Sequence, residues 1–362
     1  MAKATQNIEH FDALALNGAG HLQFSAPKHD DETNRQTHSD ANNTPGSNSQ
    51  HRAVISLIEK IESEDPTRPF TYIPVSSDPK DGWKAVTLEQ LAHAIDYLAH
   101  NISKSTANSN NEFPTVAYIG PNDVRYPMML LACIKSSCKA LFISPRNTTA
   151  VQLSLLEATD CDSLYYAESF QSIMKPCLDQ RTMEAVTIDS VDHLLGVTST
   201  RFPYSRSVEQ ARWDPLVVLH TSGSTGIPKP VFVRQGMLSA FDTLQKLPKY
   251  KDSTFIFSEW AKRASRIFIA MPMFHAAGSY STIASIYLGL PTAMPLPNKP
   301  MSVDTALDCL THAGVDGALL PPSIVEGLSA SEEGVDILTK LSFVAFAGGK
   351  LFISSLLRLP LL

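Results

Sequence analysis

The sequence predicts an α/β protein built from two layered α/β subdomains. Short apolar segments alternate with segments whose apolar residues recur at helical spacing, and the links between them are short. Such alternation is typical of parallel strands covered by helices. A loop rich in serine, threonine and glycine follows one apolar segment. The length of 362 residues is enough for a large core and for about two domains.

We expect ordered structure to begin near Ala53. Apolar side chains within Val54–Ile61 recur at helical spacing and predict an amphipathic helix. Thr71–Val75 contains a proline, which sheets confine to their edges, so we predict an edge strand there. Thr87 and Gln90 have the spacing of a capping box and predict a helix over 88–102.

A regular succession of strands and helices follows. The first half predicts strands at 115–119, 140–143 and 163–167, leading to helices near 123–137, 150–158 and 169–175. The second half predicts strands at 267–271, 291–295, 317–320 and 342–346, with helices at 278–289 and 303–313. Open α/β sheets bind ligands at the carboxyl ends of their strands, where we therefore expect the site.

The loop Thr221–Lys229 carries the clearest functional signal. It follows Leu216–Leu219, a short apolar run that predicts a buried strand. Its glycines let N–H groups approach an anion, its hydroxyls add donors, and its lysine supplies a mobile positive charge. We expect phosphate contacts from Thr221, Ser222, Gly223, Ser224, Thr225, Gly226 and Lys229. A solvated surface loop ending in a surface lysine is the alternative.

The spacing within this loop differs from that of a P-loop. A P-loop has four residues between its glycine and a Gly-Lys pair, whereas Gly223 and Gly226 are three apart and Pro228 precedes the lysine. A P-loop kinase is therefore disfavoured. Pro228 also disfavours a helix that starts directly at the loop.

These residues resemble the phosphate-loop signature of the adenylate-forming (AMP-binding) superfamily. Pro272–Gly278 is similar to the next signature, an aromatic-His segment, while Thr115–Asp123 and Ser144–Asn147 add to the likeness. Over about residues 51–350 the chain most resembles the adenylation domain of fungal nonribosomal-peptide-synthetase-like carboxylate reductases. The fold that this resemblance implies is the large N-terminal part of an adenylate-forming enzyme, without the small C-terminal lid domain.

The resemblance also implies a reaction, in which ATP activates a small carboxylic acid to an acyl-adenylate as part of secondary metabolism. Lys229 and His275 would be the catalytic residues, and His275 would also contact the AMP phosphate and the acyl group. Gly348 and Gly349 would form a turn beside adenine, although Lys350 departs from the small residue or proline usual there. A structural histidine and an ordinary strand-end turn are the alternatives.

Two further histidines, His220 and His312, are expected to be structural. Reduced core thiols are the simplest interpretation of the five cysteines, because no metal-like spacing is present. The net charge of −6 offers no basic field for nucleic acid. Residues 267–298 lack charged side chains but are interrupted by prolines, so we predict buried strands and a buried helix rather than a membrane span. With no secretory signal in view, a cytoplasmic location is expected.

We expect three segments: a disordered arm over 1–50, a partial adenylation domain over 51–350, and an aberrant apolar tail over 351–362. The tail has the character of a frameshift, retained intron or gene-model error. The family's adenine motif, whose glutamate binds Mg²⁺, has no counterpart, so we expect no metal ligand from this chain. The expected partners are a carrier protein or a full-length synthetase. A catalytically inactive remnant, which binds nucleotide or docks onto a full-length partner, is the alternative.

Overall fold

The computed structural model describes residues 52–221, 228–246 and 255–351. The predicted N-terminal arm, most of the apolar tail and residues 222–227 of the Ser/Thr/Gly loop lie outside the described residues. The arm and the tail therefore stay predictions.

Two six-stranded sheets organise the described chain. We name them the β1 sheet and the β3 sheet. The β1 sheet has the order β12-β11-β9-β10-β1-β2, with β1 (Pro69–Pro74), β2 (Trp83–Thr87), β9 (Ile267–Ile269), β10 (Thr292–Ala293), β11 (Gly317–Leu320) and β12 (Phe343–Phe346). The β3 sheet has the order β6-β5-β3-β4-β7-β8, with β3 (Thr115–Ile119), β4 (Lys139–Phe142), β5 (Cys161–Ala167), β6 (Glu184–Ile188), β7 (Pro215–His220) and β8 (Pro230–Arg234). Among the strand pairs of the described residues, only β1–β2 and β7–β8 are antiparallel.

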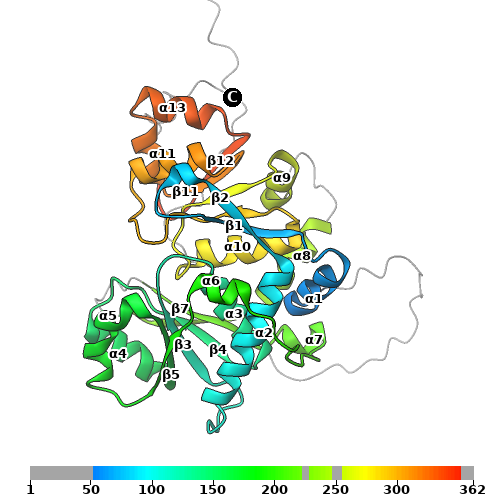
Figure 1. The fold of residues 1–362 in the computed structure, drawn as a ribbon, viewed down its shortest axis with the longest axis vertical. Coiled ribbons are helices and arrows are strands. Elements are labelled where there is room, and N and C mark those ends of the chain that lie inside the picture. Colours follow the sequence, from blue (N-terminus) through cyan, green and yellow to red (C-terminus); the bar gives the residue numbers. More distant parts are fainter. Residues whose placement is uncertain (1–51, 222–227, 247–254, 352–362) are drawn as a thin grey trace, which may run out of the picture. The chain divides into compact units, whose positions relative to one another are not determined.

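A shared layer of helices lies between the two sheets (Figure 1). It contains α1 (Val54–Glu64), α2 (Leu88–Ser105), α3 (Arg125–Lys135), α8 (Gly236–Lys246) and α10 (Ala276–Leu288). The outer face of the β1 sheet is covered by α11 (Val303–His312), α12 (Pro322–Leu328) and α13 (Glu332–Thr339). The outer face of the β3 sheet is covered by α4 (Thr149–Ala158) and α5 (Gln171–Leu178). The shorter α6 (Val191–Gly196), α7 (Val208–Ala211) and α9 (Ile256–Arg263) complete the set.

Alternation along the strands explains why both faces of each sheet are apolar. In β3, Val116 and Tyr118 pack into the central layer, whereas Ala117 and Ile119 pack under α4 and α5. All of these side chains are fully buried. Parallel strands covered on both faces need such continuous apolar runs, which is why the sequence pattern predicted them.

The predicted succession of strands and helices is confirmed, with one correction. The capping box of Thr87 and Gln90 is formed at the start of α2. The edge-strand prediction for Thr71–Val75 is wrong, because β1 lies between β10 and β2. Its proline is tolerated because Pro74 ends the strand, beyond Thr71 and Tyr72, the residues that pair with β10.

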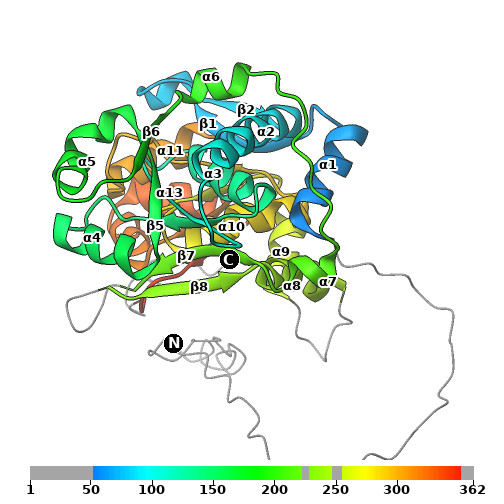
Figure 2. The same ribbon diagram turned by 90° about the horizontal axis from the view of Figure 1, so that it is seen from below.

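The two outer strands of the β3 sheet were not predicted from the sequence. β6 and β8 form the two edges of the β3 sheet (Figure 2). In β6 only Ile188 is buried, and β8 has no buried residue. An edge strand exposed to solvent carries a weak apolar signal, so neither strand was predicted.

A buried ion-pair network joins three central helices. Lys135 of α3 lies 2.5 Å from Asp96 of α2 and 2.6 Å from Glu59 of α1, measured from Nζ to carboxylate oxygen. The Lys135 side chain is 3% exposed and that of Asp96 is 4% exposed. Asp96 also accepts a hydrogen bond from the backbone N–H of Phe202. The network fixes the helices against one another, because a buried charge without its partner is strongly unfavourable.

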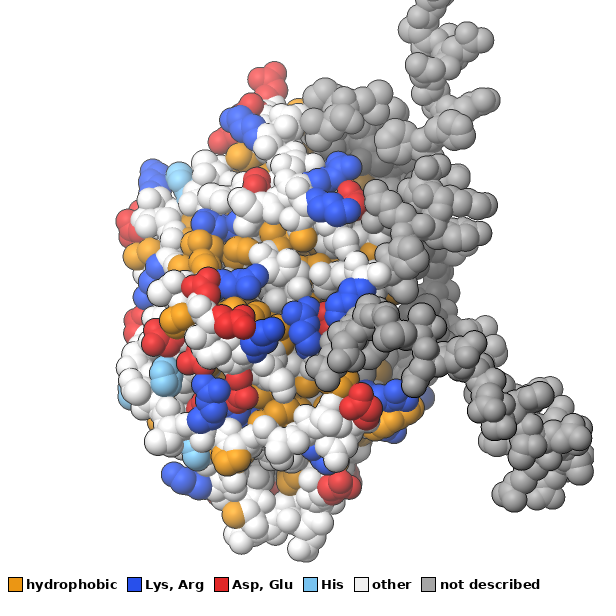
Figure 3. Space-filling model, turned by 90° about the vertical axis from the view of Figure 1, so that its right-hand side faces the viewer, with side chains coloured by type: hydrophobic (Ala, Val, Ile, Leu, Met, Phe, Trp, Pro, Cys, Tyr) orange, Lys and Arg blue, Asp and Glu red, His pale blue; other side chains and the backbone are white. Residues whose placement is uncertain are grey.

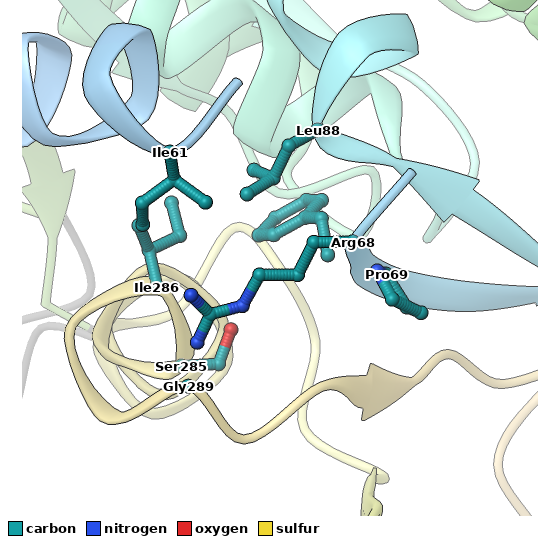
Figure 4. A pocket seen from close by; sticks show the side chains of 8 residues that line it. Ile61, Arg68, Pro69, Leu88, Ser285, Ile286 and Gly289 are labelled. Atoms are coloured by element: carbon teal, nitrogen blue, oxygen red, sulfur yellow. The ribbon is translucent and has the colours of Figure 1, made fainter. Parts of the chain in front are cut away.

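The C-terminal end of α10 lies next to the cationic side chain of Arg68. Gly289 closes the helix in the left-handed conformation, at φ +65°. The Arg68 guanidinium lies directly over it in a small cavity (Figure 4). A positive charge at a helix C-terminus is favourable. The cavity is lined by Ile61, Arg68, Pro69, Phe70, Leu88, Ser285, Ile286 and Gly289.

Charged groups of both signs are interspersed over the face in Figure 3, without a field of one sign. Within the described residues, none of the helices is long and apolar enough to span a membrane. The uncharged segment 267–298 forms β9, α10 and β10, as predicted. All five cysteines are buried and free.

Candidate functional site

Three neighbouring parallel strands of the β3 sheet have their carboxyl ends side by side, and these ends form the edge of the sheet at which the site lies. The strands are β3, β4 and β7, and they lead respectively into Gly120–Asn122, Ser144–Asn147 and His220–Thr221. The Ser/Thr/Gly loop leaves the last of these. Parallel strands place their carboxyl ends together, so polar residues from three separate segments meet here.

The ends of the loop are closed on each other. The backbone N–H of Thr221 donates to the carbonyl oxygen of Lys229 at 3.2 Å, and the N–H of Lys229 donates to Thr221 Oγ1 at 3.4 Å. Both residues are exposed. The β7–β8 hairpin therefore holds Thr221 and Lys229 together at the base of the loop. The predicted contacts Ser222, Gly223, Ser224, Thr225 and Gly226 lie outside the described residues.

A hydrogen bond connects this edge to the β1 sheet. The Asn122 side-chain oxygen accepts from the backbone N–H of Met273 at 2.8 Å. Met273 belongs to the segment that joins β9 to α10, and it is fully buried. The bond holds the His275 segment against the β3–α3 loop.

His275 is the residue that precedes α10, and its side chain makes no capping hydrogen bond. Its ring lies 4.7 Å from that of Phe274, whose neighbour Tyr126 belongs to a buried aromatic cluster with Tyr118 and Phe142. The pKa of His275 is lowered, first by partial removal of the ring from water and then by the charges of His220 and Arg146. The neutral imidazole is therefore favoured beside those groups.

His220 ends β7 and reaches the neighbouring turn. Its Nε2 accepts a hydrogen bond from the backbone N–H of Ser144 at 3.2 Å, and the Asn147 amide nitrogen lies 3.4 Å away. Its Nδ1 is buried and makes no hydrogen bond to any described residue. Burial lowers the pKa of His220, and the nearby backbone of Thr221 raises it by a smaller amount. Because Nε2 accepts, the proton of the neutral ring resides on Nδ1.

The turn held by His220 is Ser144–Asn147. The N–H of Asn147 donates to the Ser144 carbonyl oxygen at 3.0 Å, and Pro145 occupies the position that prolines favour in such a turn. Arg146 is exposed at the next position. The described residues provide no carboxylate within ion-pair distance of its guanidinium.

Gly348 and Gly349 follow β12 and are exposed. Gly348 has φ +95°, a backbone conformation that favours glycine. The nearest atom to a Cβ built on Gly349 would be Pro322 Cγ, at 3.6 Å. The two glycines lie at the same edge of the β1 sheet as the end of β9, from which His275 follows.

The groups gathered at this edge suit an anion better than a metal ion. They comprise the cations Lys229 and Arg146, the histidines and the N-terminus of α10, whose partial positive charge attracts anions. Mg²⁺ prefers oxygen ligands, above all carboxylates. Asp123 is paired with Arg125 at 2.6 Å, and no metal-binding cluster of three acidic, His or Cys groups occurs among the described residues. These residues do not fit a magnesium ion held by protein carboxylates.

The sequence analysis assigned no individual site role to Asn122 or Arg146, and it treated His220 as structural. Each follows a predicted strand, and that placement was the available signal. Which partner each side chain reaches depends on contacts between distant segments.

The sequence of this chain is similar to those of known proteins. The AMP-binding enzyme family matches residues 61–358. A carboxylic acid reductase of Neurospora crassa is 42% identical over 303 residues, which are 83% of this chain and 29% of the relative. An isocyanide synthase-NRPS hybrid of Aspergillus fumigatus is 28% identical over 82% of this chain and 20% of its own length. The chain thus spans less than a third of these relatives.

The same fold occurs in solved structures. The N-terminal domain of FACL13 from Mycobacterium tuberculosis has a TM-score of 0.66 at 17% identity, covering 84% of this chain and 72% of that one. O-succinylbenzoate coenzyme A synthetase of Bacillus subtilis, in complex with AMP, has a TM-score of 0.60 at 20% identity, covering 83% and 69%. The mixed α/β architecture predicted from the sequence is thereby confirmed. The chain belongs to the AMP-binding enzyme family, whose members form adenylates.

Proposed function

We propose that this chain binds ATP and a small carboxylic acid and activates the acid as an acyl-adenylate. The observation that carries the proposal is the convergence of Lys229, Arg146 and His275 at one edge, where the Ser/Thr/Gly loop begins. The exposed cations Lys229 and Arg146, which follow neighbouring strands of the β3 sheet, suit a polyphosphate. The family match and the relatives named as carboxylic acid reductase and adenylate-forming reductase support the choice of reaction.

In this reaction a carboxylate oxygen attacks the α-phosphorus of ATP. The bond from that phosphorus to the bridging oxygen breaks, and pyrophosphate leaves. The roles that we assign are phosphate contacts for Thr221 and residues 222–226, neutralisation of β,γ-phosphate charge for Lys229, and a contact to the reacting groups for His275. Gly348 and Gly349 would lie beside adenine. Positioning and charge stabilisation provide most of the catalysis in phosphoryl transfers.

We further propose that the chain acts as part of a synthetase-like protein of secondary metabolism that works with a carrier protein. The share of the longer relatives that it covers supports this idea. The inactive remnant is the competing candidate, since it would bind nucleotide without forming an adenylate.

Two measurements on the purified chain separate these candidates. Calorimetry with ATP tests binding, and pyrophosphate exchange with a panel of aromatic, aliphatic and amino acids tests adenylation. We expect ATP binding together with slow exchange, because the described residues of this site form no carboxylate cluster that could hold a magnesium ion beside the phosphates. Binding without exchange for any acid would favour the remnant, and absence of ATP binding would overturn the proposal.

A further inference from the structure

We propose that Arg146 is an additional phosphate-binding residue of this site and that His220 is the residue that positions it. The inference rests on the proposed function and deepens it. Neither residue belongs to the loop Thr221–Lys229 or to the His275 segment.

Arg146 lies beside the start of the Ser/Thr/Gly loop. It lies on the turn after β4, and β4 is the hydrogen-bonded neighbour of β7, from which the loop leaves. Its side chain is exposed and has no carboxylate partner among the described residues, unlike Arg125, Arg181 and Arg206. An unpaired guanidinium next to an anion-binding loop is available for bidentate contact with phosphate oxygens.

Arg146 also lies near the His275 segment. Its charge contributes to the lowered pKa of His275, which lies on the segment that joins β9 of the β1 sheet to α10. Arg146 on the β3 sheet therefore lies near His275, which follows β9 of the β1 sheet. A phosphate group bound at the carboxyl end of β7 would lie beside the bonded pair Thr221 and Lys229, and next to the turn that carries Arg146.

The turn that carries Arg146 is held from one side by His220. One ring nitrogen accepts from the N–H of Ser144 and lies near the Asn147 amide, so it contacts both ends of the turn. The hydroxyl of Ser144 also accepts from the N–H of Arg146 at 3.3 Å. His220 and Arg146 both contribute to the lowered pKa of His275, so the three side chains lie close to one another. Removing the acceptor at His220 would free the turn and, with it, the guanidinium.

Calorimetry with ATP, and separately with inorganic pyrophosphate, tests the idea on the full chain. Arg146→Ala should weaken ATP binding about tenfold, as the loss of one charge-assisted contact does, and Arg146→Lys should recover part of it. Arg212→Ala is the matched control, because Arg212 is exposed just before β7, at the opposite edge of the same sheet. This control should bind ATP like the parent.

The positioning role has its own readout. His220→Leu should weaken ATP binding about fivefold, whereas His220→Gln, which keeps an acceptor for the Ser144 N–H, should restore most of it. In an Arg146→Ala background His220→Leu should cost less than about twofold, since residues that act through one another are not additive. Arg146 is exposed, so its variants keep the test valid even if His220→Leu fails to fold.

The outcomes are distinct. A parent chain that binds neither ATP nor pyrophosphate would overturn the proposed function itself. A parent that binds ATP, with Arg146→Ala binding equally well, would overturn this inference alone. An effect of His220→Leu that persists in full without Arg146 would refute the positioning role.

Discussion

The side-chain oxygen of Asn122 accepts a 2.8 Å hydrogen bond from the backbone N–H of Met273, a residue 151 positions away. This bond joins the loop after β3 to the loop after β9, and Met273 lies two residues before His275. Asn122→Ala should lower the free energy of unfolding by about 1–3 kcal/mol, because the buried N–H of Met273 loses its acceptor. Urea unfolding checks the value. Asn122→Asp keeps the acceptor and should lose less, and equal losses in the two variants would contradict this account.

Lys229 should contribute to nucleotide binding rather than to stability. It is exposed and forms no ion pair with a described residue. Lys229→Ala should weaken ATP binding about tenfold or more, as measured by calorimetry, because one charge-assisted phosphate contact is lost. Lys340→Ala is the control, because Lys340 is an exposed lysine that directly follows α13. ATP binding of Lys229→Ala at parental affinity would rule out the assigned role.

The buried network of Lys135 should be a major determinant of stability. Lys135→Met leaves Asp96 and Glu59 without their cation, and we expect a loss of about 3–5 kcal/mol in the free energy of unfolding. Chemical denaturation of Lys135→Met and of Lys60→Met provides the comparison, because Lys60 is 63% exposed on α1. A loss below about 1 kcal/mol for Lys135→Met would show that the ion pairs contribute little.

Mild acid should destabilise the protein through its two site histidines. The pKa of His220 and that of His275 are both lowered from 6.5, chiefly by burial. Such a group binds fewer protons in the folded state than in the unfolded chain, so stability falls as the pH falls. The contribution is complete above pH 6.5 and is lost as the pH drops through the folded-state pKa values.

Unfolding by urea at about pH 7.5 and about pH 5.5 measures this effect. The double variant His220→Gln/His275→Gln should show a smaller difference between the two pH values than the parent. The same difference in both proteins would assign the acid sensitivity to other groups.

Gly289 should not tolerate a side chain. Its φ is +65°, and a Cβ would lie 2.4 Å from Arg68 Nη2. Gly289→Ala should cost about 1–2 kcal/mol from backbone strain, plus the displacement of Arg68. Thermal unfolding of Gly289→Ala, Arg68→Ala and the double variant separates the two terms. In the Arg68→Ala background only the backbone cost should persist, and an unchanged total cost would show that the guanidinium simply moves aside.

The sequence by itself determined the succession of buried strands and helices, and the place of the Ser/Thr/Gly loop after β7. These features are local: the period of apolar residues, the capping pair of Thr87 and Gln90, and the glycines and hydroxyls of one loop. They act over a few residues, so a single sequence displays them. The resemblance to the AMP-binding family rests on similarly short segments, and the family match over residues 61–358 confirms it.

The tertiary structure alone decided which of these segments meet. Sequence could not show that β1 would be flanked by β10 from far along the chain, and Pro74 therefore led to a wrong edge assignment. Nor could it show that His220 holds the turn of Arg146, because that contact joins residues more than 70 positions apart. Pairings of this kind depend on the order in which distant strands assemble within each sheet, a property of the whole core rather than of any one segment.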